Sequence, residues 1–238
     1  MLSRSPIEIR NLAEVREAIS LCVEQERSLT EGLVLELHRV LLKDVPVVPG
    51  DPLKPGEFRG PTDNKRFVGF KYLKKHRPPS WRVRSDLLKL LQDTESGRLT
   101  SDWGRAAGRF FYRFVRIHPF CDGNGRMARA LSTLLLARDH PEVLRLEKPI
   151  DEVILEHRDD YIGVLEYCDG IYEDLKEEDL PEEEKLRWAE RPFSDFYTRV
   201  FLRACRENNQ KPPKGLEEKG VAARHPKINR SVYDHLSL

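Results

Sequence analysis

Residues 117–129 contain the side chains best suited to chemistry in this chain. The segment reads Ile-His-Pro-Phe-Cys-Asp-Gly-Asn-Gly-Arg-Met-Ala-Arg and follows an aromatic run typical of a buried helix. A glycine-containing loop that leads into a helix leaves several backbone N–H groups unpaired, and the helix dipole adds a partial positive charge there. Helix N-termini of this kind bind phosphate oxygens. The segment therefore predicts an anion site.

Four ionisable side chains flank this predicted site. Arg126 and Arg129 lie three residues apart on one helix face, so both can reach the same phosphate chain. Asp122 is acidic in a site that attracts anions, which indicates a divalent cation such as Mg²⁺ between the carboxylate and the phosphates. His118 is the nearby side chain of a type whose ordinary pKa suits a general base at neutral pH. This combination predicts phosphoryl or nucleotidyl transfer.

Each of these residues also has a structural interpretation. A histidine after an aromatic helix is more often structural, and Asp-Gly-Asn-Gly alone is more often a turn or part of a calcium loop. The late glutamate of such a calcium loop is missing, and Arg126 and Arg129 taken alone could be surface residues. A match at all the fixed positions together, however, is expected by chance at about one start in 10^10. The joint pattern therefore favours the catalytic interpretation.

The segment resembles the Fic motif, H-x-F-x-[DE]-G-N-G-R-x-x-R, at every fixed position. Proteins with this motif have the mainly helical Fido fold and usually transfer AMP from ATP to a hydroxyl group. The resemblance implies that His118 deprotonates a Ser, Thr or Tyr of a target protein. It implies that Asp122 binds Mg²⁺ or Mn²⁺ on the α- and β-phosphates of ATP, and that Phe120 is buried and holds the loop. Arg126 and Arg129 would bind the β- and γ-phosphates of ATP. The backbone of Gly123, Asn124 and Gly125 would surround and bind the phosphates.

The resemblance extends beyond the motif. Residues 33–42 look like the early L-x-x-L-H-x-x-L helix of the family, and residues 56–59 look like its P-G-x-x-R segment. Residues 65–79 are placed like the β-hairpin flap that binds a target peptide by strand addition. The later R-x-x-Y-x-x-x-L helix is matched around Tyr161, which the resemblance places near the adenine end of the site. The expected fold is a mainly α, Fido-type helical bundle with a short β-hairpin flap.

Apolar spacing predicts the elements that position the motif. Ser28 and Glu31 have capping-box spacing before the second helix. Asp102 is a plausible N-cap for the aromatic helix, and a single later helix is expected to carry Val153, His157 and Tyr161. Helices are expected around residues 8–27, 33–41, 81–91, 103–117 and 124–135. We therefore expect the chain to be divided into three parts: an N-terminal helical segment (1–27), a Fic core (28–205) and a polar C-terminal extension (206–238).

Composition narrows the classes of function. The 238 residues carry 41 Lys and Arg against 40 Asp and Glu, and this balance argues against a globally basic nucleic-acid binder. The basic, aromatic stretch 54–84 would suit single-stranded nucleic acid, but the flap interpretation explains the same residues. Neither a membrane-length apolar run nor a secretory signal is present, and the four cysteines lie far apart, so we expect a cytoplasmic protein.

Three functions remain open at this point. The leading hypothesis is a protein adenylyltransferase that also labels itself, and Gly125 in G-N-G-R favours it over the phosphorylating relatives, which have A-N-K-R. One alternative is an enzyme that uses another nucleotide donor, or removes AMP, at the same site. The other is a catalytically silent binding module, and the intact His118 argues against this one. The family's inhibitory motif, [ST]-x-x-x-E-[GN], has only an incomplete copy at 20–25, where Gln25 ends it. This favours inhibition by a separate antitoxin-like chain, other regulation, or none.

Overall fold

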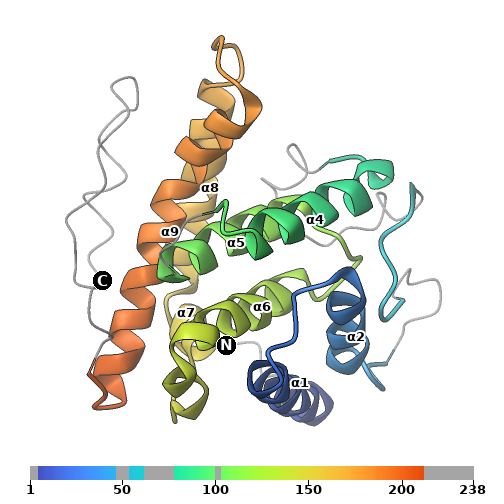
Figure 1. Cartoon of the computed structure of the whole chain (residues 1–238), viewed down its shortest axis with the longest axis vertical. Helices are drawn as coiled ribbons and strands as arrows, with labels where there is room; N and C mark the ends of the chain where they lie inside the picture. The colour runs from blue at the N-terminus through green and yellow to red at the C-terminus, as the bar shows by residue number, and fades with distance from the viewer. Residues whose placement is uncertain (1–4, 47–53, 62–77, 100–102, 212–238) are drawn as a thin grey trace.

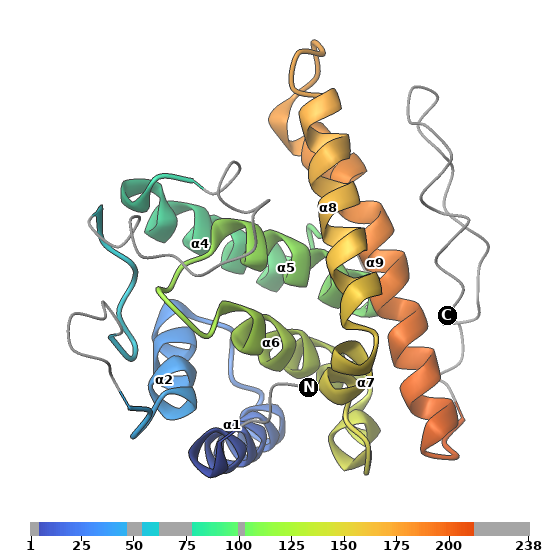
Figure 2. The same cartoon turned by 180° about the vertical axis from the view of Figure 1, so that it is seen from behind.

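The computed structural model describes residues 5–46, 54–61, 78–99 and 103–211, and within these ranges the secondary structure is helical with no strand. Figures 1 and 2 show α8 and α9 as a long pair along one side, α1 and α2 at the opposite end, and α5 and α6 between them. The elements are α1 (Pro6–Glu24), α2 (Glu31–Leu41), α4 (Ser80–Glu95), α5 (Trp103–Ile117), α6 (Asn124–Asp139), the 3₁₀ helix η2 (Pro141–Arg145), α7 (Ile150–Glu156), α8 (Arg158–Asp174) and α9 (Glu182–Glu207).

The central helix α5 packs against α4, α6 and α9. Phe110, Phe111 and Phe114 are fully buried, as the helical spacing of the aromatic run predicts. Phe111 meets Phe193 of α9 with ring centroids 4.8 Å apart. A Cβ atom at Gly108 would lie 2.7 Å from the Cα of Ser194, so α5 and α9 approach too closely there for any residue but glycine. This packing fixes the end of α5, where the motif begins.

A buried ionic cluster also joins α5 to α9. Glu190 has no exposed surface and contacts Arg113 at 2.5 Å and Arg109 at 3.4 Å. Arg113 contacts Glu183 as well, at 2.7 Å. Burial opposes the charged form of Arg113, but the two glutamates hold its pKa above the ordinary value. Breaking such a buried pair costs far more free energy than breaking a surface pair.

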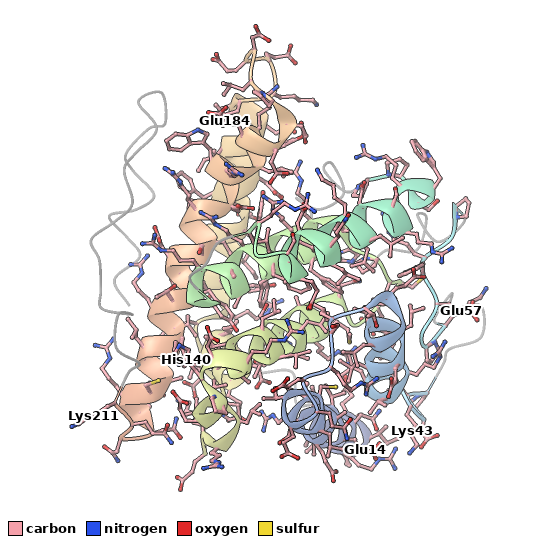
Figure 3. All side chains as sticks on the ribbon, in the orientation of Figure 1. Glu14, Lys43, Glu57, His140, Glu184 and Lys211 are labelled. Carbon is pink, nitrogen blue, oxygen red and sulfur yellow. The ribbon has the colours of Figure 1, made fainter. Side chains whose placement is uncertain are left out.

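Helix α1 packs against α2 and α6. The Asn11 amide donates hydrogen bonds to the carbonyl oxygens of Leu41, at 3.1 Å, and Lys43, at 2.7 Å. Glu14 and Lys43 form an ion pair at 3.6 Å near these bonds, and both are labelled in Figure 3. These contacts satisfy carbonyl groups at the C-terminal end of α2 and hold α1 beside it.

Two local predictions are wrong. The N-cap of α2 is Thr30, whose hydroxyl accepts a hydrogen bond from the N–H of Leu33; Ser28, expected to begin a capping box, lies two residues earlier. A capping box does occur, but at the start of α1. The helix expected to carry Val153 and Tyr161 is divided into α7 and α8, because the chain leaves helical geometry at His157, where φ is −102° and ψ is +40°.

Several expectations fall on residues outside the described ranges. The hairpin flap at 65–79 does so except for Pro78 and Pro79, as does the proposed cap Asp102. Helix α9 extends to Glu207, and the rest of the expected C-terminal extension is described only to residue 211. In the part of the chain that the structure covers, no helix is both long enough and apolar enough to cross a membrane.

Candidate active site

His118 lies directly after the last residue of α5 and is almost fully buried. Its φ of +52° is in the left-handed region, which non-glycine residues rarely adopt and which is often found at functional sites. Its Nδ1 atom lies 3.2 Å from the carbonyl oxygen of Val115, so we assign the hydrogen to Nδ1. In the neutral ring, the lone pair then lies on Nε2, which is the atom that a general base uses.

Arg59 holds the backbone around His118. Its side chain is 3% exposed, and its Nε–H donates to the carbonyl oxygen of His118 at 2.7 Å. Its Nη2 donates to the carbonyl oxygen of Pro78, and its own N–H donates to that of Pro119 at 2.9 Å. Arg59 therefore ties the motif loop to Pro78, at the end of the predicted flap. The sequence resemblance included Arg59 in a family segment but gave it no role.

Phe120 is fully buried, as expected, and anchors the loop by aromatic stacking. Its ring lies nearly parallel to that of His38 on α2, with centroids 3.6 Å apart and an interplanar angle of 8°. Phe58 stacks on it as well, at 5.8 Å. Phe120 therefore contributes to a nucleotide site by holding the loop in place, since it has no surface to offer a ligand.

His38 is the second histidine of this region, and the sequence resemblance included it in the segment 33–42 but gave it no role. Its Nδ1 accepts a hydrogen bond from the N–H of Gly56 at 2.8 Å, and its Nε2–H donates to the carbonyl oxygen of Asp122 at 3.1 Å. Burial lowers the pKa of His38 to about 4. His38 is therefore a neutral structural residue that links α2 to the motif loop. Its position on the buried face of α2, between Leu37 and Leu41, is the signal that could have identified it.

The depressed pKa of His38 makes stability depend on pH. The unfolded chain binds a proton near pH 6.5 and the folded chain only near pH 4, so stability falls as the pH falls through this window. We expect His38 to contribute a loss of roughly 3 kcal/mol in the free energy of unfolding between pH 7 and pH 4. Urea denaturation at a series of pH values measures this loss. The curve of a His38→Gln variant should be flatter by that amount, and parallel curves would contradict the prediction.

The N-terminus of α6 lies where the sequence predicts an anion site. Gly123 is its N-cap with φ of +78°, and a Cβ there would lie 3.3 Å from Leu41 and 3.4 Å from His38. The Asn124 side chain bonds the backbone of Phe120 twice, donating to its carbonyl oxygen at 2.8 Å and accepting from its N–H at 3.0 Å. The side chain of Asn124 thus closes the loop, and its backbone, like that of Gly123 and Gly125, remains for the predicted cradle.

Arg126 lies between two carboxylates. Its Nη2 contacts Asp122 at 2.8 Å, and its Nη1 contacts Glu8 of α1, also at 2.8 Å. The Asp122 side chain is 60% exposed, whereas that of Arg126 is 16% exposed. Glu8 was not expected here, because it lies 118 residues earlier in the sequence. The glutamate of the incomplete inhibitory motif, Glu24, is exposed at the end of α1 and accepts a hydrogen bond from Ser20.

Arg126 and Arg129 line a cavity of about 340 Å³ between α1, α6, η2 and α7, whose walls include Leu12, Leu146 and Ile150. Arg129 itself is 9% exposed. Tyr161 is buried in the aromatic core, where its ring meets Phe111 edge-on, and burial raises its pKa to about 12. A role for Tyr161 near the adenine of a bound nucleotide stays a prediction. The structure thus brings His118, Asp122, Arg126 and the α6 N-terminus to one loop.

Comparisons with known proteins agree with this arrangement. Residues 28–136 match the family model described as Fic/DOC family. Proteins named "Protein adenylyltransferase Fic" from Drosophila willistoni and Drosophila melanogaster are each 35% identical over 144 residues, which is 58% of this chain and 26% of either relative. The chain therefore spans about a quarter of the length of these relatives.

Two solved structures are similar over most of the chain. A Fic family protein from Desulfovibrio desulfuricans G20 has a TM-score of 0.60 and 26% identity, covering 87% of this chain and 55% of that one. A Fic domain containing signaling protein from Bacteroides thetaiotaomicron has a TM-score of 0.62 at 21% identity, covering 90% of this chain and 75% of that one, and supports the fold alone. The motif loop lies within the segment that matches, and together with the helical architecture these matches show that residues 28–136 form a domain similar to the Fic/DOC family.

Proposed function

We propose that this protein is an adenylyltransferase that transfers AMP from ATP to a Ser, Thr or Tyr hydroxyl of a target protein. The observation that carries the proposal is the hydrogen bond between Nδ1 of His118 and the carbonyl oxygen of Val115, which makes Nε2 the basic nitrogen of the neutral ring. The names of the Drosophila relatives support the same activity.

The proposed reaction uses the residues of one loop. Nε2 of His118 accepts the proton of the target hydroxyl, whose oxygen forms a bond to the α-phosphorus while the bond from that phosphorus to the bridging oxygen breaks. Pyrophosphate leaves with the electron pair of the broken bond. The N–H groups of Gly123, Asn124 and Gly125 and the guanidinium groups of Arg126 and Arg129 stabilise the negative charge on the phosphates.

The loop fits a divalent cation only in part. Asp122 offers an exposed hard oxygen ligand at the mouth of the anion site. Among the residues that the structure describes, no three His, Cys, Asp or Glu side chains gather as a metal cluster. Mg²⁺ or Mn²⁺ would therefore be held by Asp122 together with phosphate oxygens and water, as Mg²⁺ commonly is in nucleotide sites. The cation would neutralise charge on the α- and β-phosphates.

Two protein partners belong to the proposal. The target peptide would bind along residues 65–79, whose end Arg59 fastens to the motif loop. An antitoxin-like chain would inhibit by placing a carboxylate in the cavity lined by Arg126 and Arg129, whose apolar walls suit a helix with one acidic side chain. The spacing of the four cysteines supports a cytoplasmic location for this activity.

Labelled ATP tests the proposed reaction. Incubation with divalent cation should transfer the α-label, but not the γ-label, to a target or to the protein itself. We expect Asp122→Ala to reduce this transfer about 100-fold, because the cation loses its protein ligand. Glu57→Ala is the matched control, since Glu57 is also an exposed acid near the site but pairs only with Lys54 in the described structure, at 3.7 Å. Transfer of γ-label alone, or no dependence on the cation, would refute the proposal.

A further inference from the structure

We infer that Glu8, on a helix outside the segment that matches the family, is a positioning residue for the nucleotide site. Glu8 holds the Arg126 guanidinium toward the phosphates and thereby leaves Asp122 available to the divalent cation. The inference rests on the proposed function, because it assigns phosphate to Arg126 and metal to Asp122. It begins from the 2.8 Å contact between Glu8 Oε1 and Arg126 Nη1.

The Glu8 carboxylate is fixed at its other oxygen. Oε2 accepts hydrogen bonds from the N–H of Ser5 at 3.0 Å and from the Ser5 hydroxyl at 3.2 Å. The Ser5 hydroxyl in turn accepts a hydrogen bond from the N–H of Glu8, which completes the capping box of α1. Because α1 is tied to the end of α2 through Asn11, the carboxylate has a defined position relative to the motif loop. Arg126 therefore meets a rigid partner.

The two carboxylates around Arg126 differ in freedom. The Glu8 side chain is 29% exposed and held by the helix cap, whereas the Asp122 side chain is 60% exposed. When Asp122 turns to a cation, Arg126 loses that partner and keeps Glu8. An arginine held at Nη1 retains four further N–H donors, so it can bind a phosphate at the same time.

The charge balance gives a consequence for the cation. Glu8, Arg126 and Asp122 together carry a net charge of −1 if all are ionised, and a divalent cation at Asp122 changes this to +1. Without the Glu8 charge, the remaining carboxylate that Arg126 contacts in the described structure is Asp122. Arg126 would then compete with the cation for the same oxygen atoms. A role limited to helix capping would produce no such competition.

Glu8→Gln separates these roles, because glutamine also completes a capping box but carries no charge. The experiment is a calorimetric titration of the full chain with a hydrolysis-resistant ATP analogue at a series of Mg²⁺ concentrations. We expect the Mg²⁺ concentration for half-maximal nucleotide binding to rise about tenfold, as for the loss of one charged hydrogen bond. The affinity at saturating Mg²⁺ should fall several-fold, since Arg126 is less well oriented.

Glu24→Gln is the matched control. It removes the charge of an exposed glutamate on the same helix, which accepts a hydrogen bond from Ser20 and does not contact Arg126 in the described structure, so it should leave the Mg²⁺ requirement unchanged. An unchanged Mg²⁺ requirement in Glu8→Gln would overturn the inference, and so would tighter nucleotide binding, which would make Glu8 a competitor of phosphate. A wild-type protein that binds no nucleotide would refute the proposed function and this inference together, whereas normal wild-type binding with an unaffected variant refutes the inference alone.

Discussion

His118→Ala should reduce AMP transfer by about 10³-fold while the affinity for ATP changes by less than about twofold. The physical reason is that the proposed reaction uses different groups of the loop for proton transfer and for phosphate binding. In the proposed reaction the imidazole accepts the proton, whereas the phosphates would be held by the α6 N-terminus, Arg126 and Arg129, which remain in the variant. Transfer of α-labelled AMP measures the first effect, and titration with a hydrolysis-resistant ATP analogue measures the second.

His140→Ala provides the control for this experiment. His140 caps the opposite end of α6 and lies far from the loop, as its label in Figure 3 shows. Its removal should leave transfer unchanged. If His118→Ala lost ATP affinity as strongly as rate, His118 would be a binding residue, and full activity in that variant would exclude a general base at this position.

Glu190→Gln should destabilise the fold by about 3–5 kcal/mol. Glu190 is fully buried and is the shared partner of Arg113 and Arg109, so the change leaves buried positive charge without its nearest counter-charge. Because α5 ends directly before His118, the variant should also lose activity at temperatures where the wild type is stable. Urea unfolding followed by circular dichroism measures the loss of stability.

Glu183→Gln tests the same cluster at its exposed edge. Glu183 also pairs with Arg113, but its side chain is 36% exposed, so water compensates in part for the lost charge. We expect a loss of about 1 kcal/mol or less for this variant. Equal losses in the two variants would show that burial of Glu190 does not determine the cost.

The sequence predicted the parts of the site that are local in the chain. The loop, the helix start and the candidate catalytic side chains lie within residues 117–129, where the order of residue types is the signal that predicts them. The partners that complete the loop come from distant positions. Arg59, His38 and Glu8 contact it across 59, 84 and 118 residues, respectively, and no local pattern specifies such contacts.

The helices were predicted well where an apolar stripe was long, and less well at their ends. The burial of α5 follows directly from its phenylalanines at helical spacing. The cap of α2 was misplaced because Ser28 and Thr30 are both residue types that cap helices well, and the helix begins after Thr30. The break between α7 and α8 was not predicted, because no glycine or proline marks it in the sequence and the apolar stripe continues through His157.

The attachment of α1 bears on how this domain can be exchanged between genes. A recombination event that moved residues 28–136 into another chain would leave Glu8 and Asn11 behind. Arg126 would lose one of its two carboxylates, and the carbonyl groups of Leu41 and Lys43 would lose their donor. We therefore expect a segment that keeps these contacts to begin at the cap of α1, Ser5, rather than where the similarity to the family begins.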